Sequence, residues 1–130
     1  MKFLLLALMF LPTSFIFAEV DPVTSQLSTE PTVLTVGNQI MITADVSNNQ
    51  DIQQPFAYLT QVKDENQIVV SLSWLTGSLS PRQSFSPAQS WTSTEPGMYI
   101  IEVFVWKGID NPEALSAPLS MTVKVTTPPT

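Results

Sequence analysis

The sequence predicts an all-β protein built as an antiparallel β-sandwich of seven to eight strands. Prolines recur through the chain after residue 18, and each of them would interrupt the interior of a helix. Apolar residues alternate with polar ones at a period of two, which is the spacing of a strand with one buried face. Turn-forming residues separate these runs at short intervals, as expected for a sandwich.

Two segments show the alternation most clearly. In Gln39–Ser47, Ile40, Ile42, Ala44 and Val46 would share one face. In Leu115–Val125, the apolar positions are Leu119, Met121, Val123 and Val125. Both segments are therefore predicted to be half-buried strands of antiparallel sheets.

The remaining predicted strands are less regular. Phe56–Lys63 is expected to turn at residues 64–67 into a strand at Ile68–Leu75. Met98–Trp106 is the most apolar strand. Two pieces interrupted by proline are expected at sheet edges, namely Leu79–Trp91 and Val23–Val36, the second split into two short strands at Pro31.

Residues 1–18 differ in kind from the rest of the chain. Met1-Lys2 precedes the apolar run Phe3–Leu11, and Ala18 stands at the expected cleavage point, which is the pattern of a helical secretory signal peptide. We therefore expect an extracytoplasmic protein, with an uncleaved N-terminal anchor as the alternative. The expected division is a signal peptide at 1–18, an edge segment at 19–32, the sandwich at 33–125 and a Thr/Pro tail at 126–130, with no membrane span after the signal peptide.

The composition excludes several kinds of chemistry. The chain has no histidine and no cysteine, so a Ser-His-Asp triad, a thiol nucleophile and the usual zinc or copper sites are impossible. The net charge of −6 argues against nucleic-acid and anionic-membrane partners. We expect no enzymatic activity and no cofactor.

Short motifs follow one another in a characteristic order along the chain: Gly37 before the strand at Gln39–Ser47, Asn48-Asn49 after it, Leu79-Ser80-Pro81-Arg82-Gln83-Ser84-Phe85, and Ser90-Trp91-Thr92 followed by Glu95-Pro96-Gly97-Met98-Tyr99. This order resembles that of CARDB-like domains, the immunoglobulin-like adhesion modules of exported bacterial and archaeal proteins. Arg82 stands where those domains usually have glycine. The resemblance implies an immunoglobulin-like sandwich with a binding or spacing role, and it implies no shared ligand or catalytic residue.

The residues themselves suggest structural roles for the last motif. Pro96 fixes its φ and Gly97 can take a positive φ, so the pair predicts a tight reversal into the next strand. Tyr99 is then expected to form a tyrosine corner, with its hydroxyl bonded to backbone upstream. Asp45 and Asp51 are weak candidates for a Ca²⁺ site, the alternative being an ordinary polar loop.

The candidate binding residues lie on one face of the strand Met98–Trp106. The face opposite Tyr99 carries Ile100, Phe104 and Trp106, where a strand covered on one side only should be polar. With Leu59 from the neighbouring strand, these residues are expected to form an outer contact patch. The alternative is that the N-terminal segment or the loop Trp106–Pro112 covers them.

Three functions remain open from the sequence. The first is an interaction module that binds another exported or envelope protein through this face. The second is an assembly subunit that associates by strand addition, and self-association is possible in that case. The third is a surface binder of carbohydrate or Ca²⁺ that uses Trp74 or Trp91 as a stacking platform, although both tryptophans are expected to pack in the core or at an edge.

Overall fold

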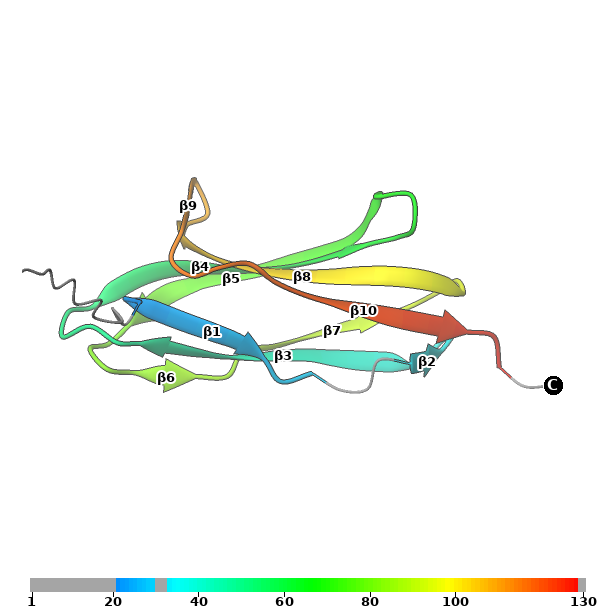
Figure 1. The fold of residues 1–130 in the computed structure, drawn as a ribbon, viewed down its shortest axis with the longest axis horizontal. Coiled ribbons are helices and arrows are strands. Elements are labelled where there is room, and N and C mark those ends of the chain that lie inside the picture. The colour runs from blue at the N-terminus through cyan, green and yellow to red at the C-terminus, as the bar shows by residue number, and fades with distance from the viewer. Residues whose placement is uncertain (1–20, 30–32, 129–130) are drawn as a thin grey trace, which may run out of the picture.

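The computed structural model describes residues 21–29 and 33–128, and these residues form two β-sheets packed face to face (Figure 1). The predicted all-β sandwich is confirmed, with ten strands instead of seven to eight. The predicted signal-peptide helix at 1–18 lies outside the described residues. Among the residues that are described, no helix has the length and apolarity needed to cross a membrane.

The smaller sheet is organised around one central strand. Its four strands are β1 (Val23–Leu27), β3 (Gln39–Asn48), β6 (Ser84–Phe85) and β7 (Ala88–Thr92). All three neighbours pair with β3 in antiparallel fashion. The alternation predicted for β3 places its apolar side chains in the core, since Ile40, Ile42, Ala44 and Val46 are each at most 1% exposed.

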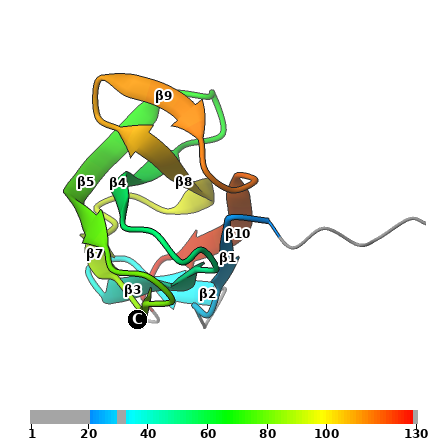
Figure 2. The ribbon, with the colours of Figure 1, turned by 90° about the vertical axis from the view of Figure 1, so that its left-hand side faces the viewer.

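The larger sheet carries the longer strands. In spatial order they are β2 (Val33–Thr35), β10 (Leu119–Thr126), β8 (Gly97–Gly108), β4 (Gln54–Lys63) and β5 (Val69–Leu79), with β9 (Asn111–Ala114) paired to β8. Only β2 and β10 pair in parallel, and the other pairs are antiparallel. Figure 2 shows β5 on the outside of the larger sheet, above β7 of the smaller one.

Most predicted segments are found close to their expected positions. The N-terminal piece divides as expected into the short edge strands β1 and β2, which belong to different sheets. Leu79–Trp91 forms two short strands, β6 and β7, at one edge of β3. Some bounds differ: β4 begins at Gln54, β5 runs on to Leu79, β10 begins at Leu119, directly after Pro118, and Thr126 ends β10 instead of opening the tail.

The space between the sheets is filled by apolar side chains. Trp91 of β7 packs edge-on against Tyr99 of β8, with their ring centroids 4.9 Å apart. Tyr58 of β4 is completely buried, and its hydroxyl and that of Thr60 have no hydrogen-bond partner among the described residues. Burial raises the pKa of Tyr58, and the neighbouring Thr60 hydroxyl offsets part of that rise.

Candidate contact surface on the larger sheet

The two faces of β8 differ as the sequence predicts. Tyr99, Ile101, Val103 and Val105 point into the core and are at most 7% exposed. Because neighbouring residues of a strand point to opposite sides, Ile100, Glu102, Phe104 and Trp106 lie on the outer face. Their environment depends on which residues of β4 and β5 lie beside them.

The pairing of β8, β4 and β5 gathers apolar side chains on this outer face. Phe104 lies opposite Leu59, and Leu59 lies opposite Trp74 of β5. Trp106 packs beside Phe104, with ring centroids 5.9 Å apart. Leu72 precedes Trp74 by two positions and shares its face. We call these five residues the outer-face patch.

The patch has a covered centre and an exposed border. Leu59 is only 6% exposed because large side chains surround it. Phe104 and Trp106 are half-buried. In contrast, Leu72 is 50% and Trp74 55% exposed. The water-facing apolar surface is therefore concentrated on β5, at the border of the sheet.

A polar row separates Ile100 from the rest of the patch. Glu102 lies opposite Gln61, whose Nε2 donates a hydrogen bond of 2.9 Å to Glu102 Oε1. The Nζ of Lys63 lies 3.1 Å from the same oxygen, and both side chains of this ion pair are largely shielded from water. Ile100 lies opposite Lys63, beyond this row. The structure thus brings together three of the four predicted residues and leaves Ile100 apart.

The segments considered as possible covers lie elsewhere where they are described. β1 is part of the smaller sheet. The residues after Trp106 form β9, which pairs with β8 through Trp106 and Ala114 and so continues the sheet. Ile109, at the tip of this hairpin, is 47% exposed. The hairpin was not predicted, since residues 108–112 were expected to form a loop.

The two other tryptophans have different environments. Trp91 is 9% exposed and belongs to the core, so it offers no stacking surface. Trp74 lies on an edge strand and is exposed. Sequence reasoning did not include Trp74 or Leu72 in the contact patch. The available signal was the alternation of Ser71 and Ser73 with these two apolar residues. Taken alone, this alternation predicts that Leu72 and Trp74 face the core, and only the pairing with β4 shows that they face outward.

The Pro96-Gly97 turn leads into β8 with the geometry of a tyrosine corner. The Tyr99 hydroxyl donates a 2.8 Å hydrogen bond to the carbonyl oxygen of Glu95. Gly97 has a φ of 148°, and a Cβ at this position would lie 3.0 Å from Glu65 Oε1. That same oxygen accepts a 2.9 Å hydrogen bond from the Met98 backbone N–H. This hydrogen bond connects the β4–β5 turn, through Glu65, to the start of β8.

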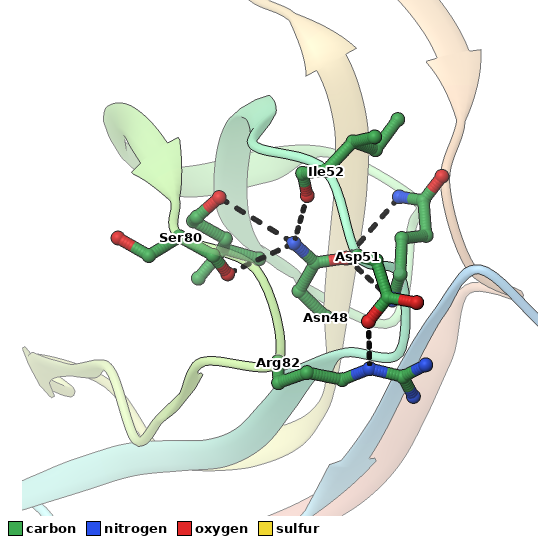
Figure 3. A network of polar contacts seen from close by, with 7 residues as sticks. Asn48, Asp51, Ile52, Ser80 and Arg82 are labelled. Carbon is green, nitrogen blue, oxygen red and sulfur yellow. Dashed lines mark hydrogen bonds and ion pairs between the residues drawn. The ribbon is translucent and has the colours of Figure 1, made fainter.

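The two candidate calcium ligands lie apart, Asp45 on strand β3 and Asp51 in the loop after it, and Figure 3 shows the contacts that hold this loop. Asn48, 1% exposed, donates from Nδ2 to the carbonyl oxygens of Ile52 and Ser80 at 2.9 and 3.0 Å. Asp51 is paired instead with Arg82, at 2.8 Å from Oδ1 to Nε. Asp45 Oδ1 accepts a hydrogen bond of 2.7 Å from the Ser86 hydroxyl. The two aspartates are therefore engaged with different partners.

The electrostatics of this loop follow from the Arg82 contact. The hydrogen bond and the charge of Arg82 lower the pKa of Asp51, although the side chains of Arg82 and Asp51 are 63% and 82% exposed. Arg82 itself has a φ of 63°, a left-handed conformation that glycine adopts without cost. The backbone at the position where CARDB-like domains usually have glycine thus keeps a glycine-like geometry. Among the described residues, no three Asp, Glu, His or Cys side chains gather to hold a metal ion.

The concave parts of the surface lie away from the outer-face patch. Two shallow grooves near the β4–β5 turn share Asp64, Glu95 and Tyr99 in their lining, and the larger has a volume of about 370 Å³. None of the patch residues lines either groove. The patch is a sheet face, which suits contact with another surface better than enclosure of a small molecule.

Comparison with solved structures identifies the fold. The CARDB domain of a Pyrococcus furiosus protein, determined in solution, superposes with a TM-score of 0.63 at 23% identity, covering 81% of this chain and 94% of that one. A crystal structure of the same domain, in complex with di-metal ions, gives 0.60 at 24% identity, over 89% and 100% of the two chains. The chain has the fold of a CARDB domain. This confirms the resemblance noted in the motifs.

The CARDB-like fold also occurs within larger proteins. A β-glucosidase from Listeria innocua, solved with glucose, matches 80% of this chain at a TM-score of 0.62 and 16% identity. The matching part is only 16% of the glucosidase. No protein-family model matches the sequence, and comparison with curated proteins also finds no match. At these identities the likeness concerns the CARDB-like fold and carries no activity with it.

Proposed function

We propose that this protein is an exported, non-catalytic interaction module that binds another envelope or extracellular protein through the outer-face patch. The observation that carries this proposal is the exposure of Leu72 and Trp74 on β5, across Leu59 of β4 from Phe104 and Trp106. A sheet with one face on the core normally presents polar side chains to water on the other. Contiguous apolar surface on that side is the usual mark of a contact site.

The binding free energy that burial of Trp74 could contribute follows from its exposed surface. A tryptophan has about 250 Å² of surface. The exposed 55% of Trp74 is therefore about 140 Å² that a partner can cover. At about 25 cal/mol per Å², full burial would contribute about 3.5 kcal/mol. Trp74 has the size expected of an interface residue that dominates binding.

Export and the absence of catalysis rest on the sequence. Residues 1–18 have the parts of a signal peptide, which supports an extracytoplasmic location. A chain without histidine or cysteine lacks the commonest general acid–base group and the thiol nucleophile. The flat patch is compatible with protein contact and holds no arrangement of acid and base groups.

Binding of an envelope protein tests the proposal. The purified protein is immobilised, partners from envelope extract are identified by mass spectrometry, and their affinity is then measured for Trp74→Ala and Trp106→Ala. A loss of about 2 kcal/mol, or roughly 30-fold in Kd, is expected for Trp74→Ala. Met41→Ala is the matched control, because Met41 is 52% exposed on β3 of the other sheet. Equal affinity of all variants, with their folding intact, would refute a role for this face.

Carbohydrate binding is the second candidate, and the exposure of Trp74 favours it. An exposed indole ring on a sheet face offers a flat apolar surface on which a sugar ring can lie. Electrophoresis through gels containing soluble polysaccharides tests it, because binding would retard the wild type and not Trp74→Ala. Unchanged mobility across a broad glycan panel would eliminate this candidate. The Ca²⁺-dependent version is not proposed, since Asp45 and Asp51 are bonded to Ser86 and Arg82.

A further inference from the structure

The strand β5 has one edge without a backbone partner. Along its length, from Val69 opposite Lys63 to Leu79 opposite Gln54, it pairs with β4 on one side only. Among the described residues, no other strand pairs with β5, and it lies at the end of the sheet. Figure 2 shows this strand on the outside of the sandwich. Its outward N–H and C=O groups are therefore available to a further strand.

The other edges of the two sheets are short or carry proline, as natural edge strands usually are. The strands β1, β2, β6, β7 and β9 have five, three, two, five and four residues. Pro22 and Pro87 lie just before β1 and β7, and β9 contains Pro112 and Glu113. In contrast, β5 has eleven residues with no proline and no charge. It therefore lacks the proline and charge that protect many edge strands, and its one irregularity, at Val70 opposite Val62 and Lys63, lies near its start.

We propose that β5 pairs with the β5 strand of a second copy of this chain, antiparallel and related by a two-fold axis at Ser73. This register places Leu72 of each copy opposite Trp74 of the other, on the outer face of both sheets. Two half-exposed apolar side chains per copy would thereby be covered. The two six-stranded sheets would become one continuous sheet.

Charge and self-complementarity make the β5 edge the place where two copies would meet. The chain carries a net charge of −6, so copies repel one another over most of their surfaces. The neutral β5 edge is a long strip where this repulsion is smallest. Lys63 on β4 and Glu102 on β8 form an ion pair, and Asp64 lies near the first residues of β5. In a two-fold dimer the same strand forms both sides of the interface, so β5 needs to fit only a second β5. Leu72 and Trp74 provide this fit, because each lies opposite the other across the axis.

This inference goes beyond the proposed function and does not depend on it. Strand pairing joins the backbone edges of β5 and packs Leu72 of one copy beside Trp74 of the other, so it shares these two side chains with the proposed binding of an envelope protein. Ser73 points to the opposite face of β5, so Ser73→Glu disturbs the strand pairing and leaves the side chains of the outer-face patch unchanged. Either property can be present without the other, and the two are measured by different experiments.

The absence of cysteine in the chain allows a direct test of the register. Ser73→Cys would place two thiols opposite each other at the two-fold axis, within the distance of a disulfide. Ser78→Cys is the matched control on the same strand, because its two copies would be about 30 Å apart at roughly 3.4 Å per residue. Mild oxidation is expected to convert Ser73→Cys into a covalent dimer and to leave Ser78→Cys at background.

Sedimentation of the wild-type protein provides the second measurement. A monomer–dimer equilibrium that shifts with concentration is expected. Ser73→Glu should abolish it, because two like charges would face each other at the axis. Circular dichroism of the variants checks folding, since the Ser73 hydroxyl donates to Gln89 at 2.9 Å. A wild type that is monomeric at every concentration, or equal cross-linking of the two cysteine variants, would overturn the proposal.

Discussion

Replacing Tyr58 with phenylalanine is expected to stabilise the protein, whereas the same change at Tyr99 is expected to destabilise it. These are the two tyrosines of the chain, and both rings are buried in the sandwich. The Tyr99 hydroxyl donates to the Glu95 carbonyl at 2.8 Å. The Tyr58 side chain is at 0% exposure, and its hydroxyl lies close enough to that of Thr60 for the Thr60 hydroxyl to lower its pKa, but it makes no hydrogen bond of regular geometry with a described residue. The substitution removes a satisfied group in one case and an unsatisfied group in the other.

The magnitudes follow from the hydrogen bonds. Loss of the Tyr99 hydrogen bond should cost about 1 kcal/mol of the free energy of unfolding. Removal of the orphaned Tyr58 hydroxyl should recover about 1 kcal/mol of its desolvation penalty. The two variants should therefore differ by about 2 kcal/mol, or roughly 8 to 16 °C in Tm for a domain of this size.

The pH dependence of stability provides a second measurement. Burial raises the pKa of Tyr58 in the folded state, so the unfolded chain loses this proton first as the pH rises. Titration of Tyr58 therefore leaves the free energy of unfolding unchanged below the unfolded pKa of about 10. As the pH rises further, the unfolded chain is ionised in preference and the free energy of unfolding falls. The wild type should thus lose stability more steeply above about pH 10 than Tyr58→Phe does.

Urea and thermal unfolding, followed by circular dichroism at pH 7 and at alkaline pH, measure both effects. Thr60→Val is the control for the neighbouring hydroxyl, which is also buried and without a partner, and it should be neutral or stabilising. If Tyr58→Phe destabilises the protein as much as Tyr99→Phe does, then the Tyr58 hydroxyl holds a hydrogen bond and the reasoning is wrong.

Three further substitutions test the loops that support the sheets. Asn48→Asp should cost about 2 kcal/mol or more in urea unfolding at pH 7, because it replaces a buried donor by a charge facing carbonyl oxygens; wild-type stability would contradict this. Gly97→Ala should lower the free energy of unfolding by about 1 to 3 kcal/mol, since a φ of 148° is unfavourable for alanine and the new Cβ would meet Glu65. An unchanged Tm of this variant would contradict the prediction. Arg82→Gly should melt at a higher temperature than Arg82→Ala because of the φ of 63°, and the reverse order would show that the position is not left-handed.

Local patterns in the sequence were sufficient to predict the sandwich. Period-two alternation identifies a strand without knowledge of its neighbours, and it located β3 and β10 well. The Pro96-Gly97 turn and the role of Tyr99 also depend on residues close together in the chain. The outer placement of Phe104 and Trp106 follows from their parity with Tyr99 on one strand.

Other features depend on the register between strands, which local patterns do not contain. A shift of one residue would exchange the two faces of β5, and only its pairing with β4 places Trp74 outside and Ser73 inside. The same pairing assembles the outer-face patch from Leu59, Trp74 and Phe104, and it separates Ile100 from them by the Glu102 row. The sequence by itself therefore determined most of the strands, with β9 as the exception, and it identified β8 as apolar on both sides. Only the tertiary structure decided which side chains meet on the outer face, because contacts between strands are set by pairing over long sequence distances.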